Sequence, residues 1–118
     1  MLRLGDLEAA VMDVLWSADA PLRVREVMGR IDPARPLAYT TVMTVLDNLH
    51  TKGLADRDRD GRAYAYRAAK SRSELGAELL REVLNISGDP ERVLLHFAQS
   101  ATPEESQFLR RAARKAQR

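Results

Sequence analysis

The chain has 118 residues, enough for one domain or for one domain with a short appendage. Its formal net charge is only +2, with 45% apolar and 31% charged residues, so any nucleic-acid signal must come from local placement of charge. The absence of cysteine excludes disulfides, thiol catalysis and thiolate metal sites, and it suits a reducing cytoplasm. No apolar run approaches the roughly 20 residues of a membrane helix, and the opening "MLRLGDLEAA" lacks the apolar core of a signal peptide. We therefore expect a cytoplasmic protein.

Three helices are predicted in the first part of the chain, over residues 5–18, 23–31 and 38–52. Gly5 or Asp6 can cap the first helix, and Pro21 separates it from the second. The two prolines of "DPARP" at 32–36 end the second helix, and Gly53 ends the third. The side chains expected to face inward are Leu7, Val11, Val14, Leu15, Ala18, Val24, Val27, Met28, Ile31, Val42, Val45, Leu46 and Leu49.

A β-hairpin follows the third helix. The residues on either side of Asp60-Gly61 alternate between apolar and charged, and this dipeptide favours a tight turn because both positions tolerate positive φ. Three helices followed by one hairpin are the winged helix-turn-helix arrangement. The alternative is a small α+β domain of no particular function.

The remaining residues, 71–118, are predicted to form three helices. These begin at the capping box Ser71–Glu74, at Asp89 with Pro90, and at Thr102 with Pro103. The fold class expected is mainly α with a small β-hairpin: a winged helix-turn-helix domain over 1–70 and a C-terminal helical dimerisation region over 71–118.

The dimerisation prediction depends on size. A segment of 48 residues lies near the limit below which an independent core usually needs a partner. We therefore favour homodimerisation through these leucine-rich helices over packing on the chain's own wing domain. The residues expected in the dimer contact are Leu79, Leu80, Val83, Leu84, Leu94, Phe97, Phe108 and Leu109.

The outward face of the third predicted helix has short polar groups and methyls where Lys and Glu are usual. Such groups suit base reading in the major groove, because Thr hydroxyls donate or accept, Thr and Met contact thymine methyls, and Asn pairs with adenine. The candidate base readers are Thr40, Thr41, Met43, Thr44 and Asn48. Asp47 on the same face could accept from a cytosine amino group or lie at the groove margin. The alternative is that this face packs on a polar neighbour.

The predicted phosphate contacts surround this helix, because the helix itself has no Lys or Arg before Lys52. The candidates are Arg23, Arg25, Lys52, Arg59 and Arg62. The hairpin also contains Asp56, Asp58 and Asp60, so it could be only a solvated hairpin.

Three blocks, "LGDLEAAVMDVLW", "LAYTTVMTVLDNLHTKGL" and "RDGRAYAYRA", resemble the penicillinase-repressor family (BlaI/MecI type) of bacterial transcription regulators. The resemblance implies a homodimer that binds a palindromic double-stranded DNA operator and blocks transcription, with the base readers at the positions named above. Several family members carry a basic residue where this chain has Thr40 or Asn48, and often Ser in place of Ala38.

The resemblance also implies a role in antibiotic resistance through a β-lactam response. In the best-known members, a membrane sensor metalloprotease cuts the dimerisation region, and the corresponding bond here is His96-Phe97. The alternative is that Phe97 is only a core residue of the dimer. The family's copper-responsive branch uses a C-terminal cysteine motif, which this chain lacks. No cofactor, metal ion or small-molecule substrate is implied.

Two other functions compete with that of a repressor. A winged-helix protein-interaction module would keep the fold but bind no specific DNA. An enzyme is disfavoured because the chain has no glycine-rich phosphate loop and its two histidines, His50 and His96, lie apart.

Overall fold

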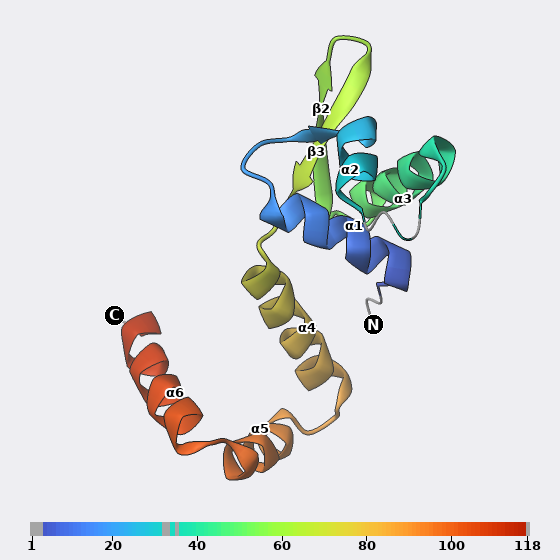
Figure 1. Cartoon of the computed structure of the whole chain (residues 1–118). Helices are drawn as coiled ribbons and strands as arrows, with labels where there is room; N and C mark the ends of the chain where they lie inside the picture. The colour runs from blue at the N-terminus through green and yellow to red at the C-terminus, as the bar shows by residue number, and fades with distance from the viewer. Residues whose placement is uncertain (1–3, 32–33, 35, 118) are drawn as a thin grey trace. The chain divides into compact units, whose positions relative to one another are not determined.

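The computed structural model describes residues 4–31, 34 and 36–117 (Figure 1). The chain divides into two compact units, Met1–Glu78 and Leu79–Arg118. This division falls inside helix α4, Arg72–Ile86. The boundary that the sequence predicts after residue 70 stays a prediction. Asp32, Pro33 and Arg35, from the segment expected to end the second helix, lie outside the described residues.

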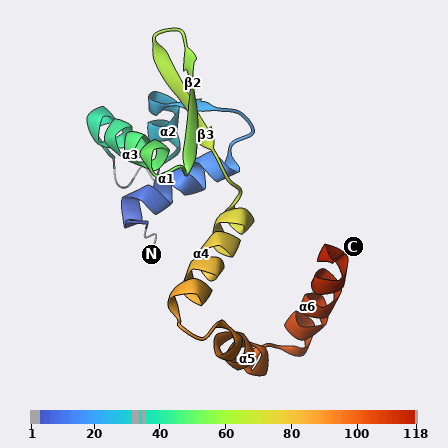
Figure 2. The same ribbon diagram turned by 180° about the vertical axis from the view of Figure 1, so that it is seen from behind.

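The first unit contains the three helices and the hairpin that the sequence predicts. The helices are α1 (Asp6–Ser17), α2 (Val24–Arg30) and α3 (Tyr39–Thr51), and the hairpin consists of β2 (Ala55–Asp60) and β3 (Ala63–Ala68). Figures 1 and 2 show the hairpin extending away from the helices, and we call residues 55–68 the wing. The expected fold class, mainly α with a small β-hairpin, is confirmed, and the hairpin is part of a three-stranded antiparallel sheet.

A third strand was not predicted. β1 (Leu22–Arg23) pairs antiparallel with β3, Leu22 lying opposite Tyr66, and gives the strand order β1-β3-β2. Two residues are too few for an alternating pattern to be recognised in a sequence. Because of this strand, α2 begins at Val24, and Arg23 lies in the sheet instead of the helix.

The core of the first unit combines one face of each helix with the base of the sheet. Most of the side chains predicted to face inward are buried, but Leu7, Ala18, Met28 and Ile31 are only partly so. Met12 was not predicted and is 1% exposed, because its place beside Val11 widens the buried stripe of α1. The buried residues are Val11, Met12, Val14, Leu15, Leu22, Val24, Val27, Val42, Val45, Leu46, Leu49, Leu54, Ala55, Tyr66 and Leu75.

The turn of the wing differs by one residue from the prediction. Asp60 is the last residue of β2 and lies opposite Ala63, so the two-residue loop is Gly61-Arg62 rather than Asp60-Gly61. Gly61 has φ of 70°, and glycine at the first loop position is the requirement of a type II′ turn. The consequence is that Arg62 lies at the tip of the wing.

The second unit contains the end of α4, then α5 (Pro90–Ser100) and α6 (Pro103–Ala116). The predicted caps are confirmed: the Arg92 amide donates to the Asp89 carboxylate at 3.1 Å, and the Glu105 amide donates to the Thr102 hydroxyl at 3.1 Å. At the start of α4, the Glu74 amide donates to the Ser71 hydroxyl, and the Ser71 amide donates to the Glu74 carboxylate. None of the described residues from 79 to 117 is buried in the single chain.

Among the described residues, no helix combines the length and apolar character needed to cross a membrane. The same residues contain no group of three or more His, Cys, Asp or Glu side chains able to hold a metal ion.

Candidate nucleic-acid interface

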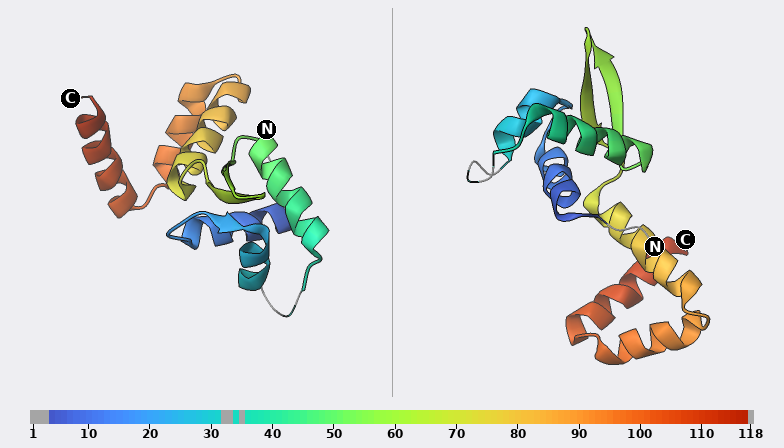
Figure 3. Two further views of the ribbon diagram at one scale, coloured as in Figure 1. Left: turned by 90° about the horizontal axis from the view of Figure 1, so that it is seen from above. Right: turned by 90° about the vertical axis from the view of Figure 1, so that its right-hand side faces the viewer.

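The five candidate base readers lie on one exposed face of α3. Val42, Val45, Leu46 and Leu49 are buried on the opposite side, which fixes the rotation of the helix about its axis. The exposed residues are Thr40, Thr41, Met43, Thr44 and Asn48. Among the described residues, therefore, no polar neighbour covers the threonine-rich face. The right-hand view of Figure 3 shows the wing rising beside this helix.

A groove of about 490 Å³ lies between α2, α3 and the wing. Its charged lining is mostly basic, with four arginines and one acid, Asp47. Tyrosine rings and a methionine side chain also line the groove. The groove therefore combines cationic groups with apolar ones, and such a lining suits the phosphates and sugars of a nucleic acid backbone. The lining residues are Arg23, Val24, Arg25, Tyr39, Met43, Asp47, Arg57, Arg62, Ala63, Tyr64 and Tyr66.

Asp47 connects α3 to the wing. Its Oδ1 accepts hydrogen bonds from Arg57 Nη1 at 2.9 Å and from the Tyr66 hydroxyl at 2.8 Å. The Arg57 guanidinium also lies over the Tyr64 ring, 4.3 Å from its centroid. Burial raises the pKa of the Tyr66 hydroxyl above its usual value, and the hydrogen bond to Asp47 raises it further. The Asp47 carboxylate is therefore occupied by the wing, a role that its position on α3 does not predict.

The arginines near the groove differ in how they are paired. Arg23 forms an ion pair with Asp60 at 2.8 Å and also donates to the Asp60 carbonyl at 3.2 Å. Arg25 lies over the Tyr39 ring at 5.4 Å, and Arg59 over the Tyr64 ring at 5.3 Å. No described carboxylate pairs with Arg25, Arg59 or Arg62. These three cations are the ones free to meet a phosphate.

The acids of the wing do not cancel these cations. Asp56 and Asp58 both pair with Arg67, and Asp60 pairs with Arg23. Each hairpin carboxylate thus has a basic partner that is not Arg59 or Arg62.

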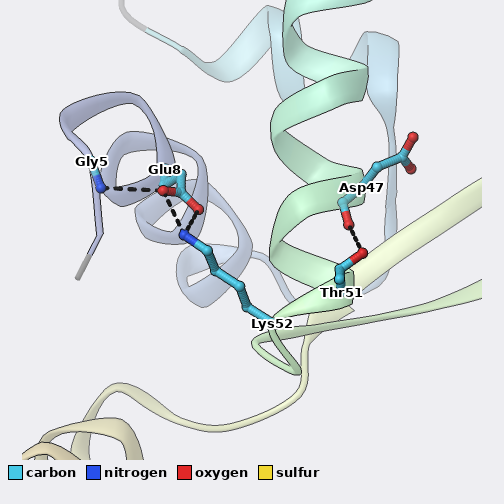
Figure 4. A network of polar contacts seen from close by, with 5 residues as sticks. All are labelled: Gly5, Glu8, Asp47, Thr51 and Lys52. Carbon is cyan, nitrogen blue, oxygen red and sulfur yellow. Dashed lines mark hydrogen bonds and ion pairs between the residues drawn. The ribbon is translucent and has the colours of Figure 1, made fainter. Parts of the chain in front are cut away.

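Lys52, the fifth predicted phosphate contact, is occupied within the protein. Its ammonium donates to both carboxylate oxygens of Glu8, at 2.9 Å and 2.7 Å, and so joins the end of α3 to the start of α1 (Figure 4). The Glu8 carboxylate also accepts from the Gly5 amide at 3.3 Å. Thr51 donates to the Asp47 carbonyl at 3.0 Å within the same helix.

The Glu8–Lys52 pair predicts a pH effect on stability. The hydrogen bond from Lys52 holds the pKa of Glu8 below its ordinary value of 4.5, against an opposing effect of burial. A carboxyl whose pKa is lower in the folded state adds stability above its unfolded pKa and loses it as the pH falls through the folded value. We expect Glu8→Gln to lower the free energy of unfolding by up to about 1 kcal/mol at pH 7.

That difference should shrink toward zero below pH 4.5. Urea unfolding of both proteins from pH 3 to pH 7 measures this difference in the free energy of unfolding. A difference that stays constant with pH would show that the charge of Glu8 does not stabilise the fold.

The residues predicted for dimerisation and cleavage lie in the second unit or at its edge. Leu79 and Leu84 are half-buried, and His96 is exposed. The other six dimerisation candidates are exposed in the single chain: Leu80, Val83, Leu94, Phe97, Phe108 and Leu109. The His96-Phe97 bond lies inside α5.

Sequence reasoning missed Tyr64 and Tyr66 as parts of the groove, and it placed Arg57 in the basic cluster of the hairpin without including it among the phosphate contacts. The signal was available in the wing register, because Arg57 lies opposite Tyr66 and Arg59 opposite Tyr64. Residues two apart on a strand share a face, so a correctly placed turn groups these four side chains on one side of the sheet.

Comparison with known proteins gives consistent matches. The family model described as penicillinase repressor matches residues 4–115. The chain is 45% identical over 115 residues to the transcriptional regulator BlaI of Mycobacterium tuberculosis, covering 95% of this chain and 83% of the relative. Neither description names an enzyme.

Two solved structures are also similar. One is the Bacillus licheniformis BlaI monomer in complex with the blaP half-operator, with a TM-score of 0.51 and 25% identity over 62% of this chain and 88% of that chain. The other is an ArsR-like transcriptional regulator from Rhodococcus sp. RHA1, with a TM-score of 0.53 and 21% identity over 84% of this chain and 85% of that chain. The second likeness concerns the fold alone.

Proposed function

The chain belongs to the penicillinase-repressor family, and we propose that it is a homodimeric DNA-binding transcriptional repressor that reads a palindromic operator with α3 and the wing. The observation that carries this proposal is the exposed Thr, Met and Asn face of α3 beside a groove whose charged lining residues are mainly arginines. The relative solved with its half-operator supports DNA as the ligand.

The contacts divide by chemistry. The base edges would be met by the exposed short side chains of α3, where no unpaired charged side chain competes for them. These residues are Thr40, Thr41, Met43, Thr44 and Asn48. Arg25, Arg59 and Arg62 would meet phosphates, because they have no carboxylate partner among the described residues. Arg23 and Lys52 would contribute less, since each is held by an acid of the protein.

The dimer is supported by the apolar surface of the second unit. Ile86, Leu80 and Phe108 are 70%, 66% and 61% exposed in the single chain. Exposed apolar side chains that are this numerous and this close in the sequence favour association with another protein surface. A second copy of the chain fits a palindromic operator, because a two-fold dimer presents two recognition helices about 34 Å apart.

Relief of repression by proteolysis is part of the proposal. Cleavage of the His96-Phe97 bond would separate α6 and the end of α5 from the rest of the chain, and so remove part of the apolar surface that the dimer needs. Because the bond lies in a helix, that helix must open locally before an active site can accept it in extended form. A membrane sensor metalloprotease of the β-lactam response would supply the chemistry.

A salt titration tests the phosphate part of the proposal. Arg62→Ala should weaken binding to every duplex alike and reduce the slope of log affinity against log salt by about one per subunit. Arg67→Ala is the matched control, because Arg67 is held by Asp56 and Asp58 and does not line the groove. Fluorescence anisotropy with labelled duplexes measures both. An unchanged slope for Arg62→Ala would place the wing tip away from the DNA backbone.

A further inference from the structure

Among the described residues, Asp47 is the one acid in the lining of the basic groove. A carboxylate among DNA-facing groups is unfavourable near phosphates, so its presence requires an explanation. Its side chain is 47% exposed, and it is therefore not an ordinary core group. The structure shows what it holds, namely Arg57 on β2 and the buried Tyr66 on β3.

Two of the four groove arginines are held by a carboxylate, Arg57 by Asp47 and Arg23 by Asp60, and Arg57 is the less exposed of the two. Its guanidinium donates to Asp47 at 2.9 Å, lies 4.3 Å from the centroid of the Tyr64 ring, and is 27% exposed. Arg62 at the tip, by contrast, has no such partner among the described carboxylates. Asp47 thus neutralises Arg57 inside the groove, as Asp60 neutralises Arg23 at its edge.

We propose that Asp47 is a positioning and specificity-determining residue, which withdraws Arg57 from DNA phosphates and sets the wing against α3. This inference rests on the proposed function. Phosphate contacts strengthen binding to every sequence, whereas base contacts distinguish sequences. An Arg57 held by Asp47 adds little to sequence-independent binding. The same bonds from Asp47 hold the wing against α3. The wing is then placed to contact DNA when α3 is aligned with the bases of its operator.

The test compares Asp47→Asn with the wild-type protein on operator and random duplexes over a range of salt. Asparagine keeps an acceptor for the Tyr66 hydroxyl but loses the charge that holds Arg57. We expect affinity for random duplex to rise about three- to fivefold, the value of one exposed ion pair. The salt slope should steepen by about 0.9 per subunit, and the ratio of operator to random affinity should fall.

Three further variants identify the cause. Asp58→Asn makes the same charge change on the wing, but the arginine that it affects is Arg67, which keeps Asp56 as a partner and does not line the groove. This variant should therefore leave the salt slope and the ratio unchanged. The double variant Asp47→Asn with Arg57→Gln should return the slope to the wild-type value. Tyr66→Phe keeps the Asp47–Arg57 pair and should not steepen the slope.

The proposal is overturned if Asp47→Asn weakens binding to both duplexes alike, since that is the result of a purely structural role. It is also overturned if Asp58→Asn reproduces the effect, or if the double variant keeps the steeper slope. A wild-type protein that does not prefer its operator over random duplex would instead overturn the proposed function, so the two failures are distinguishable.

Discussion

Phe108→Asp should convert the protein to a monomer and abolish tight operator binding. Phe108 is 61% exposed in the single chain and lines a shallow apolar groove with Phe97 and Leu109. In the proposed dimer this side chain is covered, and a carboxylate there would be a buried, unpaired charge. Such a charge costs about 3–5 kcal/mol, so self-association should weaken at least about a hundredfold. Operator affinity should fall with it, because one winged helix then binds alone.

Gln107→Asp is the matched control for this change. It adds the same charge at the neighbouring exposed position of α6 but removes no apolar side chain. Sedimentation equilibrium measures the association of both variants, and circular dichroism checks that their helices are retained. If Phe108→Asp dimerises as the wild type does, α6 is outside the dimer contact, and the second unit must associate through another face.

Met43→Ala and Thr44→Ala should each weaken operator binding by about 1–3 kcal/mol and relax the preference at one base pair. Both side chains are exposed on α3, and Met43 also lines the groove beside the wing. The loss should be confined to the operator, with random duplex bound nearly as before, because neither side chain carries charge. Titrations against operators substituted one base pair at a time measure the relaxed position.

Thr51→Ala controls for the loss of a threonine from the same helix. The Thr51 hydroxyl donates to the Asp47 carbonyl within α3 and so is not available for a base. We expect this variant to bind the operator as the wild type does. Neutral results for both Met43→Ala and Thr44→Ala would mean that this face does not read bases.

The outline of the fold was predictable because it depends on local signals. Helical spacing of apolar residues located α1 to α3, and capping residues such as Ser71, Asp89 and Thr102 located the later helices. These features depend on residues three or four apart, which a sequence displays directly. The exposed face of α3 followed from the same spacing, since four buried side chains fix which residues point outward.

The partners of the charged residues were not predictable, because they depend on which helices and strands lie close together in the folded chain. Lys52 meets Glu8 from 44 positions away in the sequence, and Arg23 meets Asp60 from 37. The local pattern shows these residues only as cations near a helix end. Asp47 illustrates the limit most clearly: its place on α3 suggested a base contact or a position at the groove margin, whereas its partners come from the two strands of the wing.

In the proposed complex, two copies of α3 and its wing bind one palindromic operator. Hydroxyl-radical footprinting of the DNA upstream of the protein's own gene can detect this arrangement. We expect two protected half-sites related by a two-fold axis, with centres about one helical turn apart, and protection that weakens as salt rises. Phe108→Asp should lose this pattern, and Gln107→Asp should keep it. An unprotected upstream region, or a single protected half-site with the dimeric protein, would show that the protein does not bind DNA in this way.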